Sequence, residues 1–559
     1  MKKLILFIIL FNISLLSGCN SNSTVTIVNS DNYNHDLFYE NDLELMGADP
    51  SVIYINEGEE AGYYYMYITS DAIDVSGYLA YRSKDLTNWE RVGTALERYD
   101  FTDENNSRYL SFGTFDYWAP EVIYDSNKKL YYMFYSANSY DAKPGDDYHF
   151  YGDVAISDSP KGPFIPYNAY YQNNPILWNK AYNTYIYKPL FDFSLMDKSN
   201  PLYEKKTGGY MKIIDLCPFI DPKTNEKYVY FVRDLYPEAG IVNSKIYVIK
   251  CDDNWLPNYD EVYCLTTPNK INVDDEQERQ ILKEGKVNEG PYMIFHNDKY
   301  YLLYSACSYN QKQYSVRVAV GDSPIGPFEK LEPDNGGYLL YAESKNTWVG
   351  GTGHCSVVNK DGQEYIVYHA HQTNTNEFSR GIAKDEIHWV KNNDGLDIMV
   401  CNGPSYAILP NTSGEYSNVI RKASITSSRD NETLNFLYDG VVLYHNFPFL
   451  NETKFKEGKE SIIISFDKSI IISSISIFNS FYEDLRLDKI DNIIFKCNCE
   501  TIKTGLIEFD IEKYTDKYGN YIPGGSFSIE LDNEEVNEIE IVIDNDKEFN
   551  LSEIIVLSK

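Results

Sequence analysis

Basic residues are scarce in this chain. Its 559 residues include 50 Lys and Arg against 83 Asp and Glu, which gives a formal net charge of -33. A nucleic-acid partner requires a positively charged surface, so this balance excludes that class of partner. The acidic excess is the ordinary property of a solvated surface and says little about the fold.

Cysteine is also rare, with nine residues in the whole chain. The closest pair, Cys497 and Cys499, lacks the second pair that a structural zinc site would need. Cys251 and Cys264 flank a segment that a disulfide could close. The others lie mostly in apolar, strand-like segments, where a free cysteine packs as a small hydrophobe. We therefore expect neither structural zinc nor a dense disulfide framework.

Long apolar runs are missing except at the start of the chain. Two lysines precede Leu4–Leu16, a run too short to span a membrane and typical of a secretory signal. Leu16-Ser17-Gly18-Cys19 resembles a bacterial lipobox, which implies cleavage before Cys19 and attachment of lipid to its thiol. We expect a signal peptide in residues 1–18, a tether in 19–33 and a lipid-anchored protein of the cell envelope, periplasmic or surface-exposed. The alternative is a plain secretory signal with a chance cysteine.

Helical patterns are absent as well, whereas tyrosine-rich strand patterns fill residues 40–410. Five short segments in this region share one pattern, a leading residue with an apolar residue four positions on, and a tyrosine-rich run follows each. They are Asp49-Pro-Ser-Val-Ile, Ala119-Pro-Glu-Val-Ile, Asp215-Leu-Cys-Pro-Phe, Glu289-Gly-Pro-Tyr-Met and His354-Cys-Ser-Val-Val. Such recurrence predicts a repeat architecture, here a five-bladed β-propeller over residues 34–410. A β-sandwich array is the alternative, and it explains the repeated leading residues less well.

The pattern changes after Pro410. Residues 411–559 contain short strands separated by Gly and Asn turns, which predicts a β-sandwich. Leu437-Tyr-Asp-Gly440, followed by Ile462–Phe466, resembles the discoidin-type, galactose-binding-like sandwich. That resemblance implies a carbohydrate-binding domain, and a purely structural appendage is the alternative. The expected fold class is all-β, a five-bladed β-propeller followed by a β-sandwich.

The leading residues of the five units carry the expected chemistry. On a common propeller axis, Asp49, Asp215, Glu289 and His354 would meet in one site. Hydrolysis of a glycosidic bond needs an acid for the leaving oxygen and a base on the opposite side of the sugar, about 6.5–9.5 Å away in an inverting enzyme. A third carboxylate beside the acid keeps that acid protonated near neutral pH. Taken alone, each of these acids is typical of a turn, and only their common position favours catalysis.

The motifs around these residues resemble glycoside hydrolase family 43. The resemblance implies a five-bladed propeller that hydrolyses arabinose- or xylose-containing plant polysaccharides with inversion. The third motif departs from the family's usual Asp-Pro-x-x-Phe, because Leu216 replaces the proline, while Asp215 and Phe219 keep their spacing. The motifs, one per blade and in order, are Gly47-Ala-Asp49-Pro-Ser-Val, Trp118-Ala-Pro-Glu-Val, Ile214-Asp215 before Phe219-Ile-Asp221, Glu289-Gly-Pro-Tyr and Gly351-Thr-Gly-His354.

The resemblance implies a role for each matching residue. Asp49 is the expected general base and Glu289 the general acid. Asp215 is expected to raise the pKa of the acid and to orient it. Trp118 is the expected platform for the sugar ring, with a core tryptophan as the alternative. Arg380 is expected to bind sugar hydroxyls, with a surface arginine as the alternative.

His354 is expected near the base of the funnel, in contact with a calcium ion or an ordered water. Calcium prefers several oxygen ligands, so a buried, hydrogen-bonded histidine is the alternative. The chemistry requires no cofactor, and a structural calcium near the funnel is the one ion that the resemblance implies.

The sequence therefore predicts an inverting glycosidase, and an exo-acting α-L-arabinofuranosidase is favoured. A β-xylosidase, an endo-arabinanase and a β-galactosidase are alternatives, because the rim loops that close the funnel decide among them. The alternative of another class is a non-catalytic, surface glycan-binding lipoprotein, which loss of a leading carboxylate would favour; all three are present. Expected partners are plant polysaccharides or oligosaccharides, with membrane contact only through a lipid on Cys19.

Overall fold

The computed structural model describes most of the chain, and strands dominate it. The predicted signal peptide and Cys19 lie outside the described residues. No helix within the described ranges is long and apolar enough to cross a membrane. The described residues are 25–28, 33–41, 43, 45–69, 77–97, 100–102, 108–110, 115–138, 150–171, 176–179, 184–187, 189–191, 212–235, 243–266, 268, 284–285, 287–341, 349–372, 379–405, 408–444, 447–508 and 525–559.

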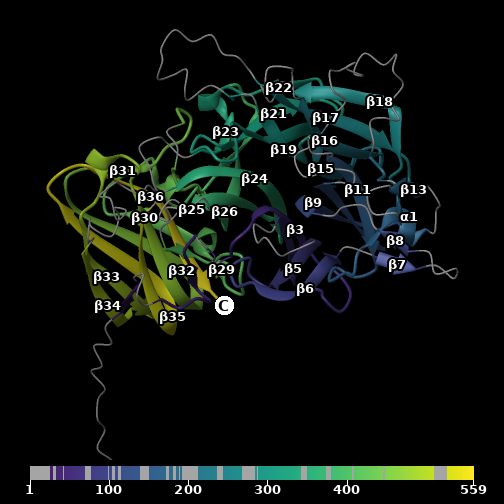
Figure 1. The fold of residues 1–559 in the computed structure, drawn as a ribbon. Coiled ribbons are helices and arrows are strands. Elements are labelled where there is room, and N and C mark those ends of the chain that lie inside the picture. Colours follow the sequence, from purple (N-terminus) through teal and green to yellow (C-terminus); the bar gives the residue numbers. More distant parts are fainter. Residues whose placement is uncertain are drawn as a thin grey trace, which may run out of the picture.

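Five antiparallel sheets form the blades of a propeller, to the right of the C-terminal domain in Figure 1. Each blade contains four consecutive strands, and the fourth has β23 (Tyr338–Leu340) in addition. The predicted five-bladed propeller is therefore confirmed. The blades are β3 (Ala48–Tyr54), β4 (Tyr64–Thr69), β5 (Gly77–Ser83) and β6 (Glu90–Glu97); β9 (Phe115–Asp125), β10 (Leu130–Asn138), β11 (Phe150–Ser157) and β12 (Ile165–Pro166); β15 (Lys212–Ile220), β16 (Lys227–Leu235), β17 (Asn243–Cys251) and β18 (Pro257–Thr266); β19 (Asn288–His296), β20 (Lys299–Ala306), β21 (Ser315–Gly321) and β22 (Phe328–Lys330); and β24 (Val349–Lys360), β25 (Gln363–Gln372), β26 (Arg380–Lys391) and β27 (Asp397–Cys401).

The tyrosine-rich strands are apolar on both faces because each lies between two neighbouring blades. In β4, Tyr65 and Tyr67 pack in the cluster shared with the second blade, which includes Met133. Tyr64 and Met66 point the other way and pack against the fifth blade. Side chains alternate between the two faces of a strand, so a strand buried on both faces is apolar at every position.

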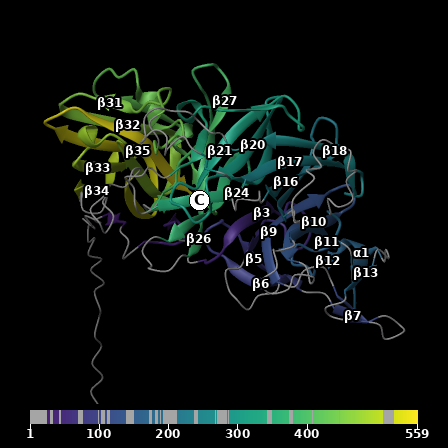
Figure 2. The same cartoon turned by 45° about the horizontal axis from the view of Figure 1, so that its top comes forward.

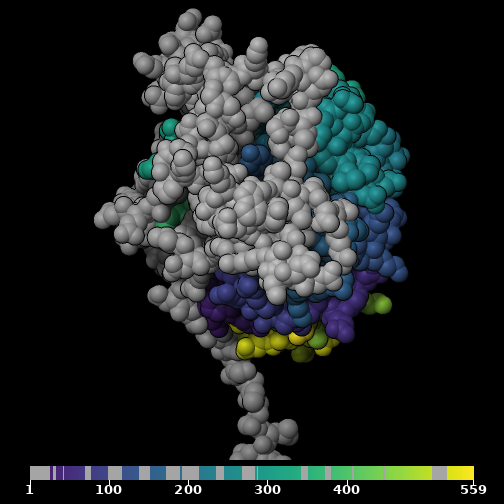
Figure 3. Space-filling model, turned by 45° about the vertical axis from the view of Figure 1, so that its right-hand side comes forward, coloured from purple at the N-terminus to yellow at the C-terminus, as the bar shows by residue number. Residues whose placement is uncertain are grey.

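The first strand of each blade lies innermost. β3, β9, β15, β19 and β24 contact one another in that order, and β24 contacts β3 to close the ring. The chain just before β3 strengthens the closure, since the N–H groups of Leu43 and Gly47 donate to the carbonyls of Ile382 and Arg380 in β26, at 3.3 and 3.0 Å. In Figure 3 the teal, blue and purple parts of the chain follow one another down the right-hand side. The ring brings residues that are far apart in the sequence to one axis.

A small additional sheet and a few short helices lie outside the blades. The sheet has the order β13-β14-β8-β7, and its strands come from the segments that join the first three blades. These elements are β7 (Asp100–Thr102), β8 (Arg108–Leu110), β13 (Ile176–Asn179), β14 (Thr184–Tyr187), α1 (Tyr167–Tyr170), and the 3-10 helices η2 (Pro333–Asn335), η3 (Ile420–Lys422), η4 (Leu434–Leu437) and η5 (Glu483–Leu485).

The C-terminal residues form a second, sheet-rich domain around a core of their own. The pairing of its two long strands has register shifts, one of them between Ser465 and Ile470. β1 lies inside the predicted tether and pairs with this sheet, because Val25–Val28 is a β-branched run. The strands are β1 (Thr26–Ile27), β29 (Ser417–Asn418), β30 (Ala423–Ser427), β31 (Thr453–Phe455), β32 (Gly458–Asn479), β33 (Lys489–Cys497), β34 (Glu500–Glu508), β35 (Ser526–Asn545) and β36 (Phe549–Ser558).

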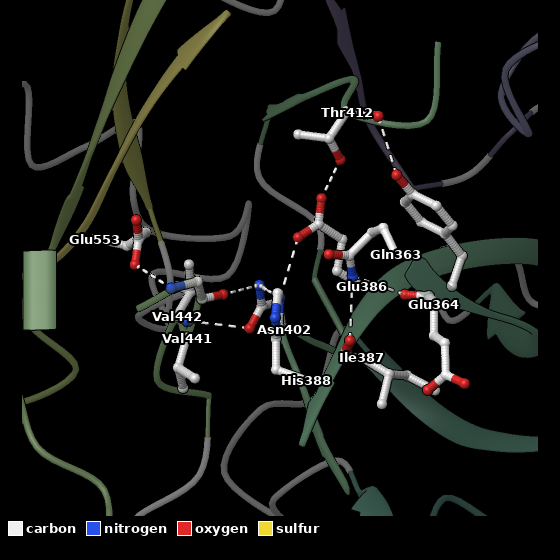
Figure 4. A network of polar contacts seen from close by, with 12 residues as sticks. Gln363, Glu364, Glu386, Ile387, His388, Asn402, Thr412, Val441, Val442 and Glu553 are labelled. Atoms are coloured by element: carbon white, nitrogen blue, oxygen red, sulfur yellow. Dashed lines mark hydrogen bonds and ion pairs between the residues drawn. The ribbon is translucent and has the colours of Figure 1, made fainter. Parts of the chain in front are cut away.

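The second domain packs against the fifth blade, as Figures 1 and 2 show. β2 (Phe38–Tyr39) pairs with β28 (Leu409–Pro410) beside this junction. Val441 and Leu443 are buried with Ile398 and Val400 of β27. The Asn402 side chain donates to the Gly440 carbonyl at 2.9 Å and accepts the N–H of Val442 at 3.0 Å (Figure 4). The junction therefore combines apolar burial with satisfied backbone groups.

The cysteines of the described residues are all free, Cys251 and Cys264 included. Five of the eight are buried. They therefore fill apolar space, as the sequence predicts for most of them.

Candidate functional site

Each innermost strand carries a β-bulge at the same place, with a second register shift in the second and fifth blades, and one residue at each bulge adopts a left-handed conformation. These residues are Asp49 (φ 52°), Ala119 (φ 47°), Asp215 (φ 57°), Gly290 (φ 55°) and His354 (φ 44°). Such backbone costs about 1–2 kcal/mol for a residue with a side chain, and bulges of this kind turn side chains toward active sites. The repeated bulge therefore determines which side chains point toward the propeller axis.

The position of Glu289 differs from the sequence prediction by one residue. The sequence pattern aligned Glu289 with Asp49 and Asp215, whereas the structure places Gly290 there. Glu289 pairs with Ser305 across the ladder, as Trp118 pairs with Ser136 in the second blade. The proline that follows the left-handed residue in three blades is the signal that gives the correct alignment.

In four of these left-handed residues, the backbone N–H group donates to a side chain of the preceding blade. Three of the acceptors, Thr69, Ser305 and His369, lie on the second strand of their blade. Each is paired across the ladder with the residue that precedes the left-handed residue of that blade. In the third blade the equivalent position is occupied by Val232, whose side chain cannot accept a hydrogen bond. The Asp215 side chain accepts the N–H of Gly290 instead. The pairs are Asp49 N with His369 Nδ1 (3.2 Å), Ala119 N with Thr69 Oγ1 (2.7 Å), Gly290 N with Asp215 Oδ2 (3.0 Å) and His354 N with Ser305 Oγ (2.8 Å).

Asp49 is a buried carboxylate surrounded by hydrogen-bond donors and positive charge. Its Oδ2 accepts the hydroxyl of Thr69 at 2.7 Å, and its Oδ1 lies 3.3 Å from His354 Nδ1 and 3.6 Å from an Arg380 nitrogen. Burial alone would raise the pKa of this carboxyl, but His354 and Arg380 outweigh it and hold the pKa well below its usual range. Asp49 is therefore ionised at working pH, which is the state that the expected role of general base requires.

Asp215 and His354 connect Asp49 to the strand that carries Glu289. His354 Nδ1 lies 3.9 Å from Asp215 Oδ2 as well as 3.3 Å from Asp49. The same Asp215 oxygen accepts the N–H of Gly290, the residue after Glu289. Glu289 itself is half-buried, and its Oε1 accepts the hydroxyl of Tyr314 at 2.9 Å. The structure thus brings Asp49, Asp215 and His354 together and places Glu289 beside them.

Arg380 and Trp118 differ in how far their side chains are buried. Arg380 is only 8% exposed, and its guanidinium lies beside Asp49 and 5.3 Å from the ring centroid of Tyr309. It is therefore part of the site rather than a surface arginine. Trp118 is half-buried and packs partly against the apolar cluster of the third and fourth blades. Its role as a sugar platform stays a prediction.

The donor set at His354 does not fit a calcium ion. Calcium takes six to eight oxygen ligands, whereas His354 Nδ1 faces two carboxylates that already hold other partners. In the described part of the chain, no three His, Cys, Asp or Glu side chains gather as metal ligands. His354 instead lies between Asp49 and Asp215, and this donor set does not support the expected calcium.

Three site residues were not found from the sequence: Thr69, His369 and Tyr314. Thr69 and His369 belong to tyrosine-rich runs, where they look like ordinary strand residues. Thr69 faces Ala48 and His369 faces Gly353, which are equivalent positions in the ladders of the first and fifth blades. An alignment of the bulged segments would have identified both residues. Tyr314 immediately precedes β21, and its sequence context gives no such signal.

The sequence was compared with protein families and curated proteins. The family model described as Glycosyl hydrolases family 43 matches residues 43–180 and 199–395, more than half of the chain. A β-D-galactofuranosidase, xynD, of Aspergillus niger is 39% identical over 97 residues, 17% of this chain and 26% of its own length. An extracellular endo-α-(1→5)-L-arabinanase of Thermotoga petrophila is 25% identical over 257 residues, 44% of this chain and 45% of its own. The chain thus spans less than half the length of both curated relatives.

Solved structures of similar proteins were found as well. A thermostable family-43 glycoside hydrolase is 29% identical, with a TM-score of 0.48, over 66% of this chain and 98% of that one. An endo-1,4-β-xylanase from Bacteroides thetaiotaomicron is 26% identical, with a TM-score of 0.44, over 65% and 96%.

Proposed function

Since the chain belongs to the glycosyl hydrolases of family 43, we propose that it is an inverting glycosidase that acts on arabinose- or xylose-containing plant polysaccharides. The observation that carries the proposal is the grouping of Asp49, Asp215 and His354 beside Glu289 on the propeller axis. Three carboxylates with separate environments provide a base, an acid and a residue that tunes the acid.

In this mechanism Asp49 takes a proton from a water molecule, whose oxygen attacks the anomeric carbon. The glycosidic C–O bond breaks as Glu289 donates its proton to the leaving oxygen, and the anomeric configuration inverts. Asp215 holds the N–H of Gly290 and so fixes the strand next to Glu289. Arg380 supplies positive charge beside the base and a donor for sugar hydroxyls.

We favour an exo-acting α-L-arabinofuranosidase, with a β-xylosidase and an endo-arabinanase as the other candidates. The arabinanase named among the relatives supports an arabinose substrate. Lipid anchoring at Cys19 and a place in the cell envelope complete the proposal; they rest on residues outside the described ranges.

The test is hydrolysis of aryl α-L-arabinofuranoside, β-D-xyloside and β-D-galactofuranoside by the wild type and by Glu289→Gln. We expect the wild type to hydrolyse the arabinofuranoside with inversion, seen by NMR of the first product, and the variant to lose about 10²–10⁴-fold in kcat. Retention of configuration, or equal activity of the two proteins, would contradict the mechanism. Binding of arabinan without hydrolysis of any substrate would favour a glycan-binding protein instead.

A further inference from the structure

Tyr314 contacts the expected general acid directly. It is only 1% exposed, and its hydroxyl donates to Glu289 Oε1 at 2.9 Å. Burial, and then the charge of Glu289, raise the pKa of Tyr314 well above its usual range, so the phenol keeps its proton and remains a donor.

The ring of Tyr314 is held on two sides. One face stacks on His369, with ring centroids 5.6 Å apart and an interplanar angle of 15°. Gly353 runs against the ring so closely that a Cβ at this position would overlap it. A buried ring confined in this way cannot swing its hydroxyl away from Glu289.

His369 continues the contact from Tyr314 to the expected base. Its Nδ1 accepts the backbone N–H of Asp49 at 3.2 Å and lies 3.3 Å from the Asp49 carboxylate. The side chain is fully buried, and burial lowers its pKa to about 4, so the imidazole is neutral at working pH. The stacked pair of Tyr314 and His369 therefore spans the space between Glu289 and Asp49.

We propose that Tyr314 is a positioning residue for the general acid, and that its stacking on His369 sets the placement of the acid relative to the base. Because Glu289 Oε1 accepts the phenol hydrogen, the proton that goes to the leaving group resides on Oε2. After transfer, the same phenol hydrogen bond stabilises the carboxylate on Oε1. This inference rests on the proposed function, in which Glu289 is the acid and Asp49 the base.

The first test is Tyr314→Phe, which keeps the ring and removes the hydroxyl. On the aryl glycoside that the wild type hydrolyses, we expect kcat/KM to fall about 10-fold or more with a phenyl leaving group, and less with 4-nitrophenyl, which needs little protonation. The alkaline limb of the pH profile should move to higher pH, because a carboxylate that loses a donor is harder to ionise. An equal loss of kcat/KM on both substrates, with no shift of the alkaline limb, would overturn the proposal. Tyr314 would then contribute only to packing.

Two further variants separate positioning from folding. Gly353→Ala keeps the hydroxyl but displaces the ring, and it should reproduce the leaving-group dependence. Tyr301→Phe removes a buried phenol of the same blade that donates to the Asp397 carbonyl, so it should lower the Tm without moving the pH limb. If the wild type hydrolyses neither an aryl glycoside nor arabinan, the proposed function fails. The hydrogen bond is then judged by NMR titration of Glu289 in the wild type and Tyr314→Phe, where equal pKa values would overturn it.

Discussion

The hydroxyl group of Thr69 is the residue-scale feature that best shows how the site is assembled. It donates to Asp49 Oδ2 and accepts the N–H of Ala119, both at 2.7 Å, so one side chain orients the base and joins the first blade to the second. Thr69 is 2% exposed, and water therefore cannot replace either bond.

We predict that Thr69→Val, which conserves shape, lowers kcat about 10- to 100-fold, because a hydrogen bond to a charged group contributes about 1.5–3 kcal/mol. KM should change little, since this hydroxyl is buried and already bonded to Asp49 and Ala119. Thr69→Ser is the matched control and should retain most of the activity. Steady-state kinetics on the best aryl glycoside measures both, and a valine variant with wild-type kcat would refute the role.

At the scale of elements, the bulged inner strand is the repeated structure that builds the site. Its left-handed residue is a glycine only in the fourth blade, where a Cβ would come within 3.1 Å of the His354 ring. Gly290 is thus needed for close packing in addition to its φ of 55°.

Gly290→Ala should therefore displace His354 and lower kcat, in addition to a backbone cost of about 1–2 kcal/mol. Gly362→Ala is the control, because Gly362 has a φ of 90° with no atom within 4 Å of an added Cβ. The control should lose stability but keep kcat. Thermal unfolding and kinetics of both proteins distinguish the two effects; equal kcat values would show that the contact with His354 is unimportant.

At the scale of the whole molecule, the junction between the propeller and the second domain is buried and apolar. Leu443 is 2% exposed in the cluster with β27, and Asn402 satisfies the backbone of Gly440 and Val442 beside it. Interfaces of this kind resemble a domain core, so the two parts are expected to unfold together.

Calorimetry of the wild type should accordingly show one cooperative transition. Leu443→Asp, which buries a charge in the junction, should separate it into two transitions or lower the Tm strongly. Ile471→Asp is the control on the same domain, because Ile471 is 51% exposed. An unchanged single transition in Leu443→Asp would mean that the junction does not couple the domains.

The sequence predicted the propeller and most of the site because the same short sequence pattern recurs in each blade. Asp49, Asp215 and His354 lead short segments that recur once per blade, and the structure gathers all three. Arg380 was found through resemblance, and the structure removes the surface alternative by burying it beside the base. Strand alternation predicts which face a side chain occupies, but it cannot show which blade lies opposite.

The sequence by itself therefore determined the all-β class and the five blades, since each depends on residues close together in the chain, and the repeat of these local segments predicted carboxylates on one axis. Only the tertiary structure decided that Gly290, and not Glu289, takes the left-handed position. It also decided that Tyr314 and His369 lie between acid and base. The contacts of His369 with Tyr314 and with Asp49 join different blades, and their geometry exists only once the ring has closed and buried them.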